Sequence, residues 1–212
     1  MFRRGFLAGF ATLAAAPAFG QARGISPFAP QVDYAIDGTF SVPGEGKRPE
    51  TARIWRTRNA VRYEAADGIE RHVVARLDLD RAWLSLPGLG VAFETDLSGF
   101  GLSPAALRGD GFRLTQVATE NLAGQATTKL RMTRDRRDPY FDGFAWVDAR
   151  GILWKLQGAG EAMGQPGTLD WRFSNAAVGP VPRDKLEAPP GKIVPVAGEA
   201  LAGMLRRFGL VR

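Results

Sequence analysis

Apolar and polar residues alternate along much of this chain, with the period of two that is typical of β-strands buried on one face. The first clear example sets Tyr34, Ile36, Gly38, Phe40 and Val42 against Asp33, Asp37, Thr39 and Ser41. The most regular pattern comes later, where Leu169, Trp171 and Phe173 alternate with polar residues. Such segments recur at hairpin spacing, and they predict roughly ten strands.

The segment Glu120–Leu156 is predicted to hold a run of consecutive strands. Its last two strands meet at Asp148–Gly151, a glycine-containing turn of the kind that joins hairpins. This hairpin places Trp146 and Trp154 on neighbouring strands of one sheet. We therefore expect the segment to be central to the fold.

Helical signals are confined to two short segments. Leu102–Leu107 is predicted to be a helix with Ser103 as its N-cap, and apolar residues follow helical spacing within Val196–Phe208. No helical crossover separates the strands, so we expect an antiparallel sheet. Because such a sheet must hide its edges, the predicted fold is mainly β: an open, incomplete antiparallel β-barrel with a short internal helix and a C-terminal helix as cover.

Glycine and proline predict two irregular segments. Gly158–Gly167 is expected to be a loop because it is rich in glycine. Asn175–Lys192 is rich in proline and is expected to run extended along a sheet edge, because proline cannot donate a hydrogen bond to a central strand.

The first 22 residues have the features of a secretory signal peptide. A positive start with Arg3 and Arg4 precedes a short apolar run, and small residues around Ala22 form a cleavage site. The Arg pair followed by Phe6 and Leu7 resembles a twin-arginine signal; a general secretory signal is the alternative. The mature chain, residues 23–212, is expected to be one domain in the periplasm, and the sequence predicts no transmembrane anchor in it.

The composition limits the kinds of chemical site and binding partner that can be expected. The sequence contains no cysteine, which excludes disulfides, thiolate metal sites and a cysteine nucleophile. Removing Arg3 and Arg4 with the signal lowers the formal net charge from +6 to +4. This modest charge suits solubility or contact with anionic envelope polymers. Nucleic acid is not an expected partner, since the aromatic residues follow no stacking motif interleaved with basic residues.

Several short motifs, taken in order, resemble a known group of proteins. They are Tyr-x-Ile-x-Gly-x-Phe from Tyr34, LDLDRAWLSLPG at 77–88, Leu122–Arg131, Gly143–Val147, Gly151–Leu156 and Leu186–Lys192. In this order the motifs resemble the DUF4412 and outer-membrane-lipoprotein-sorting (LolA-like) proteins. The chain departs from their pattern at Leu130 and Lys192, where tyrosine is usual, and at Leu186, where phenylalanine is usual. The resemblance implies an incomplete barrel that encloses an apolar cavity and binds lipid or acyl chains.

Aromatic residues supply the candidate ligand-binding surface. The proposed lining consists of Tyr34, Phe40, Trp146, Trp154, Trp171 and Phe173. Buried aromatic residues can equally serve to fill a core. A basic loop that contains Arg134, Arg136 and Arg137 is the candidate for contact with lipid headgroups or a partner; a solvated loop with internal ion pairs is the alternative.

Candidate catalytic chemistry is sparse. His72 is the only histidine, it lies on the polar face of its predicted strand, and no nucleophile elbow accompanies it. No cofactor or metal site is expected with one histidine and no cysteine. The working hypothesis is a non-catalytic periplasmic protein that binds a lipid or acyl-chain ligand. The alternatives are an envelope interaction protein with a filled core and an envelope protein partner, or an enzyme of unfamiliar type.

Overall fold

The computed structural model describes residues 25–41, 49–65, 70–99, 108–134, 140–162, 165–198 and 200–201. Within these ranges the strands are β1 (Tyr34–Ser41), β2 (Glu50–Arg56), β3 (Ala60–Ala65), β4 (Arg71–Arg76), β5 (Arg81–Leu86), β6 (Val91–Thr95), β7 (Phe112–Leu122), β8 (Gln125–Arg134), β9 (Phe141–Val147), β10 (Leu153–Ala162), β11 (Gln165–Val178) and β12 (Lys192–Pro195). The helical elements are the 3-10 turn η1 (Pro87–Leu89) and the short helix α3 (Arg183–Leu186).

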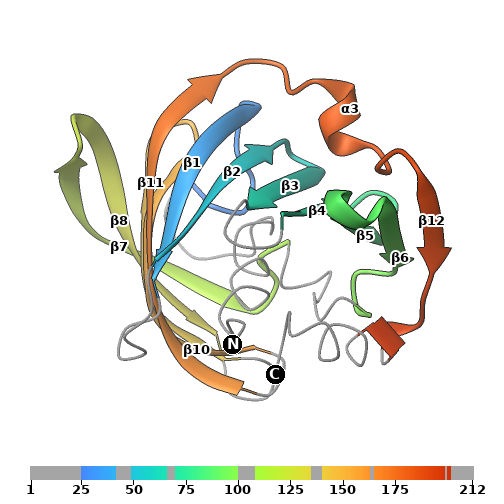
Figure 1. Cartoon of the computed structure of the whole chain (residues 1–212). Coiled ribbons are helices and arrows are strands. Elements are labelled where there is room, and N and C mark those ends of the chain that lie inside the picture. Colours follow the sequence, from blue (N-terminus) through green and yellow to red (C-terminus); the bar gives the residue numbers. More distant parts are fainter. Residues whose placement is uncertain are drawn as a thin grey trace.

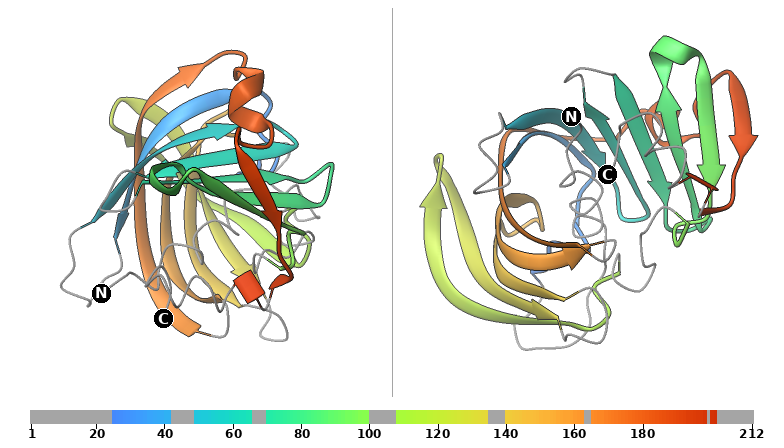
Figure 2. Two further views of the ribbon diagram at one scale, coloured as in Figure 1. Left: turned by 45° about the vertical axis from the view of Figure 1, so that its right-hand side comes forward. Right: turned by 60° about the horizontal axis from the view of Figure 1, so that its bottom comes forward.

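All of these strands belong to one 12-stranded sheet in the order β12-β6-β5-β4-β3-β2-β1-β11-β10-β9-β8-β7. Neighbours pair antiparallel, except for β12, which runs parallel to β6. The sheet is strongly curved, and no pairing among the described residues joins β7 to β12 (Figures 1 and 2). The predicted open antiparallel barrel is confirmed.

The hydrophobic core lies on the inner, concave side of this sheet. Alternate residues of β1 to β11 face this side, and their apolar side chains form one buried cluster. Side chains from so many strands can share a cluster only where the curvature brings them together. A lead-in segment at residues 25–32 adds to the core, because Phe28 stacks on Phe112 with ring centroids 4.9 Å apart.

Two glycines allow the backbones of β9 and β10 to approach closely. Gly143 of β9 pairs directly with Gly158 of β10. A Cβ on Gly143 would lie 2.3 Å from the carbonyl oxygen of Gln157, and a Cβ on Gly158 would lie 2.6 Å from the carbonyl oxygen of Asp142. The expectation of a loop at Gly158–Gly167 is therefore wrong, since most of these residues lie in β10 and β11.

The predicted turn at Asp148–Gly151 is confirmed. The buried carboxylate of Asp148 accepts hydrogen bonds from the backbone N–H groups of Arg150 at 2.9 Å and Ile152 at 3.0 Å. Gly151 has a φ of +85°, and its backbone approaches Pro30 of the lead-in segment so closely that a Cβ would lie 2.9 Å from the Cα of Pro30. A residue with a side chain would be strained at this positive φ, and its Cβ would clash with Pro30.

The proline-rich segment follows a different course from the predicted one. Residues 175–178 belong to β11, which lies inside the sheet between β1 and β10. The chain then forms α3, which contacts β3 and β4, and only β12 lies at an edge, beside β6. In Figure 1 this connection passes over the outer side of the sheet. The predicted edge position is therefore wrong for most of the segment.

Other predictions lie outside the described residues: the signal peptide, the helix at Leu102–Leu107 and most of the C-terminal helix, of which residues 198, 200 and 201 are described as helical.

Candidate functional site

Five of the six predicted lining residues share the inner face. Tyr34 and Phe40 come from β1, Trp154 from β10, and Trp171 and Phe173 from β11. The strand register explains this arrangement, because Phe40 pairs with Trp171 and Trp171 pairs with Leu156. Residues paired directly across antiparallel strands point to the same side of a sheet.

Phe40 is the centre of an aromatic group on this face. Its ring lies 5.2 Å from Trp171, 5.8 Å from Phe173 and 5.6 Å from Tyr63 of β3, measured between centroids. The contacts with Trp171 and Phe173 are edge-to-face, the geometry that the ring quadrupoles favour. The lack of a side chain at Gly38 leaves room for the Phe40 ring, because a Cβ at this position would lie 2.6 Å from Phe40 Cζ.

A buried polar group borders these rings. The Tyr63 hydroxyl donates a hydrogen bond of 2.6 Å to Glu50 Oε1, and Arg71 forms an ion pair with the same oxygen. Glu50 and Arg71 are 3% and 7% exposed, so this pair is shielded from water. Buried ion pairs of this kind are sensitive to the loss of either partner.

A second polar pair lies where β1 meets β2. Tyr34 pairs with Arg56, and both side chains are almost fully buried. The Arg56 guanidinium donates to the carbonyl oxygens of Phe28 at 3.0 Å and Ala60 at 3.1 Å. Burial raises the pKa of Tyr34 to about 12 and lowers the pKa of Arg56 to about 10. At neutral pH the tyrosine is therefore neutral and the arginine is charged.

Trp146, the sixth predicted residue, lies on the outer face, so the expectation that it shares the lining is wrong. It pairs with Lys155, and the Nζ atoms of Lys155 and Lys129 lie 4.6 Å and 4.9 Å from its ring centroid. Its Nε1 donates a hydrogen bond of 2.7 Å to Glu120. The small residues Ala145 and Val147 take the inner positions of β9 instead.

The proposed headgroup residues are only partly described. Arg134 ends β8, and its guanidinium lies 5.4 Å from the ring centroid of Phe112. Arg136 and Arg137 lie outside the described residues.

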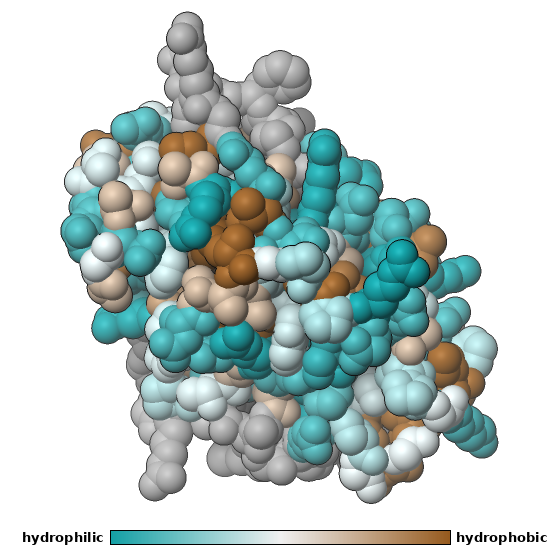
Figure 3. Space-filling model, turned by 90° about the horizontal axis from the view of Figure 1, so that it is seen from above, coloured by the Kyte–Doolittle hydropathy of each residue, from teal (hydrophilic) through white to brown (hydrophobic). Residues whose placement is uncertain are grey.

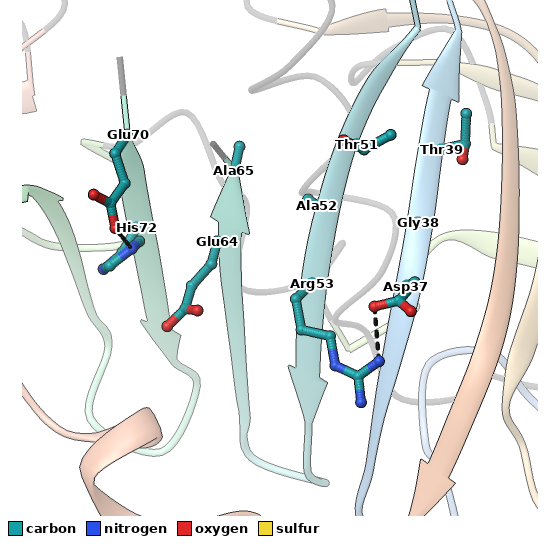
Figure 4. Close-up of a pocket in the computed structure, with 10 residues that line it drawn as sticks. All are labelled: Asp37, Gly38, Thr39, Thr51, Ala52, Arg53, Glu64, Ala65, Glu70 and His72. Carbon is teal, nitrogen blue, oxygen red and sulfur yellow. Dashed lines mark hydrogen bonds and ion pairs between the residues drawn. The ribbon is translucent and has the colours of Figure 1, made fainter. Parts of the chain in front are cut away.

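A groove on the outer face was not anticipated from the sequence. It has a volume of about 400 Å³ and is lined by Asp37, Gly38, Thr39, Thr51, Ala52, Arg53, Glu64, Ala65, Glu70 and His72 (Figure 4). Asp37, Arg53 and Glu64 occupy outward-facing positions of β1, β2 and β3, and Glu70 immediately precedes β4. The polar residues of the strand pattern were therefore the available sequence signal. Arg53 Nη1 and Asp37 Oδ1 form an ion pair at 2.7 Å between the neighbouring strands β2 and β1.

Both ring nitrogens of His72, the histidine in this groove, contact neighbouring side chains. Its Nδ1 lies 3.0 Å from Arg62 Nη2, and its Nε2 lies 3.0 Å from Glu70 Oε1. Because arginine can only donate, Nδ1 accepts and Nε2 carries the proton. Burial lowers the pKa of His72, and Arg62 adds to this effect. Both ring nitrogens of His72 therefore take part in hydrogen bonds within the protein.

The neighbouring carboxylate anchors α3. Burial alone would raise the pKa of Glu64, but Arg62 at 2.5 Å and Lys185 of α3 at 3.2 Å hold it below its ordinary value. Lys185 also lies 4.7 Å from the ring centroid of Trp55. The contacts around Glu64 therefore hold the connection between β11 and β12 against the outer face.

Metal-binding and membrane-spanning features are both absent from the described ranges. No group of three histidine, aspartate or glutamate side chains is placed to hold a metal ion there. Within the same ranges, no helix has the length and apolar character needed to cross a membrane.

The surface seen from above is largely hydrophilic around a small apolar patch (Figure 3).

No protein-family model matches the chain, and no curated protein matches it significantly. Solved structures do match. An uncharacterised conserved protein from Thermus thermophilus is 10% identical with a TM-score of 0.53, and the match covers 78% of this chain and 91% of that one. At this identity the likeness shows the fold alone.

Other matches have lower TM-scores. The complex structure of Pseudomonas aeruginosa MucA/MucB matches with 21% identity and a TM-score of 0.47, over 75% of this chain and 56% of that one. The chain thus spans little more than half of that structure. A LolA superfamily protein from Nitrosomonas europaea matches with 9% identity and a TM-score of 0.39, over 86% and 96% of the two chains.

Proposed function

We propose that this protein is exported to the periplasm and binds a lipid or another hydrophobic ligand on the inner face of its open barrel, without catalysing a reaction. One observation carries the proposal: the inner face of an unclosed sheet is apolar across β1 to β11. A barrel of this kind can hold a small ligand against its inner face, and its open side can admit an acyl chain.

The proposed lining comprises Tyr34, Phe40, Trp154, Trp171 and Phe173. An acyl chain placed against them gains about 0.8 kcal/mol for each methylene group that leaves water. In this proposal the C-terminal helix around Leu201 to Phe208 serves as a lid, and Arg134, Arg136 and Arg137 contact a polar headgroup. Both assignments rest on the sequence pattern.

The test is ligand binding by the purified protein. We expect lipids to co-purify without detergent, identified by mass spectrometry, and a fluorescent fatty acid to bind and be displaced by phospholipid. Phe40→Ala should weaken binding, because Phe40 contacts three other rings on the inner face. Phe144→Ala on the outer face is the matched control and should bind normally. Absence of both co-purified lipid and fatty-acid binding would contradict the proposal.

A second candidate function is supported by the burial of the same side chains. Tyr34, Trp154, Trp171 and Phe173 are only 2%, 8%, 3% and 6% exposed. Side chains packed to this degree also suit a filled core, and the protein would then act through its surface as an envelope interaction protein. This candidate predicts no lipid uptake and no response of the tryptophan fluorescence to fatty acids.

A further inference from the structure

One polar atom on the inner face has no hydrogen-bond partner. The indole Nε1 of Trp154 is buried, and none of the described residues accepts a hydrogen bond from it. The whole residue is 8% exposed. An N–H group that is shielded from both water and protein acceptors is unfavourable, and native proteins rarely leave one in this state.

Two tryptophans on the outer face provide an internal comparison. Trp83 Nε1 donates to Glu94 at 2.7 Å, and Trp146 Nε1 donates to Glu120 at the same distance. The sheet therefore supplies acceptors for these indoles on its outer face. The unpaired indole, that of Trp154, lies on the inner face, where the ligand is proposed to bind.

The register places Trp154 in apolar surroundings. Lys155 pairs with Arg172 of β11 and with Trp146 of β9 on the outer side. Trp154, one position before Lys155, is therefore turned inward and belongs to the same buried cluster as Phe173 of β11. On the β9 side the register shifts between Leu153 and Lys155, which leaves Trp154 without a paired residue there. The nearest inner-face residues along β10 and β9, Leu156 and Ala145, are apolar as well.

We propose that the ligand presents a neutral carbonyl oxygen, from an ester or amide linked to its hydrophobic chain, to Nε1 of Trp154. A single neutral donor in apolar surroundings suits such an acceptor. It suits a carboxylate poorly, because a buried charge needs a paired cation or several donors. A pure hydrocarbon would leave the N–H unpaired. This inference rests on the proposed function and adds to it the chemical class of the ligand.

The test compares two ligands that differ only in the carbonyl group: 1-palmitoylglycerol, an ester, and 1-hexadecylglycerol, the corresponding ether. Isothermal titration should show the ester binding the purified protein about three- to tenfold more tightly, the range expected for one net hydrogen bond. Trp154→Phe should remove this difference while keeping the affinity for the ether. Trp146→Phe, the same substitution on the outer face, should keep the difference.

A second measurement does not depend on any variant. In protein labelled with ¹⁵N at tryptophan, the Trp154 indole N–H resonance should move downfield on addition of the ester and less on addition of the ether. Equal binding of the two ligands, or no such movement, overturns the inference and leaves lipid binding intact. If neither ligand binds, the proposed function falls together with the inference.

Discussion

The glycine pair in β9 and β10 allows the curvature of the sheet to be tested with one methyl group. In Gly143→Ala, the new Cβ would meet the carbonyl oxygen of Gln157 at 2.3 Å and the Cα of Gly158 at 2.7 Å. Both atoms belong to the backbone of β10, which is held by its pairing with β9 and β11. The clash cannot be relieved by turning a side chain, so the two strands must move apart.

The expected cost follows from this geometry. Overpacking a well-packed core costs about 1–3 kcal/mol, and a clash with backbone belongs at the upper end of that range. We therefore expect Gly143→Ala to lower the free energy of unfolding by about 3 kcal/mol. For a domain of this size, about 1 kcal/mol corresponds to roughly 2–4 °C in Tm, so the Tm should fall by about 6–12 °C.

Thermal unfolding followed by circular dichroism measures this change. Gly167→Ala in β11 is the matched control, because a Cβ there meets no atom within 4 Å among the described parts of the chain. It should leave the Tm within about 2 °C of the parent protein. The reasoning is refuted if Gly143→Ala is as stable as the parent, or if the two variants are destabilised equally.

Three further predictions concern polar contacts. Glu50→Gln should lower the free energy of unfolding in urea by about 3 kcal/mol, because the buried charge of Arg71 loses its counterion; no loss would show that the pair is not needed. His72→Asn should flatten the loss of stability as the pH falls below the ordinary histidine pKa of 6.5. The lowered pKa of His72 means that the unfolded chain takes up the proton first, so acid favours unfolding; parallel stability curves for the two proteins would contradict this. Lys185→Ala should lower the free energy of unfolding by no more than about 1 kcal/mol. It should nevertheless increase the rate of amide hydrogen exchange in α3, because it removes the contact with Glu64. An unchanged exchange rate would argue against the anchoring role of Lys185.

Strand alternation was enough to predict the main features of the fold. The pattern around Tyr34 and Phe40 gave β1 with its inner face, and the turn at Asp148–Gly151 gave the β9–β10 hairpin. Both depend on local rules, namely the period of two and a residue with positive φ. The open shape followed from the absence of helical crossovers between strands.

The errors arose where tertiary structure overrides local preference. Gly158 and Gly160 suggested a loop, but they lie in a strand because the curvature of the sheet leaves no space for a Cβ. Trp146 suggested an inner position because it is apolar, but its outer position is stabilised by Lys129 and Lys155. Cation–π contacts between a lysine ammonium group and an aromatic ring are not revealed by hydrophobicity alone.

The candidate site was predicted less completely than the fold. Five of the residues proposed as a lining share the inner face, since each lies on a strong period-two strand; their contact with a ligand stays a prediction. The Glu50–Arg71 pair and the outer groove depend on which strands become neighbours. A single sequence contains no direct signal for such pairings across the sheet.

The location of the ligand is the central claim, and fluorescence quenching by a monoacylglycerol brominated on its acyl chain tests it most directly. Two variants are needed, one that retains only Trp154 and one that retains only Trp146, with phenylalanine at the other tryptophan positions. Bromine on the acyl chain should quench Trp154 on the inner face strongly and leave Trp146 on the outer face unquenched. Equal quenching of the two, quenching of Trp146 alone or no quenching of either would contradict a ligand on the inner face.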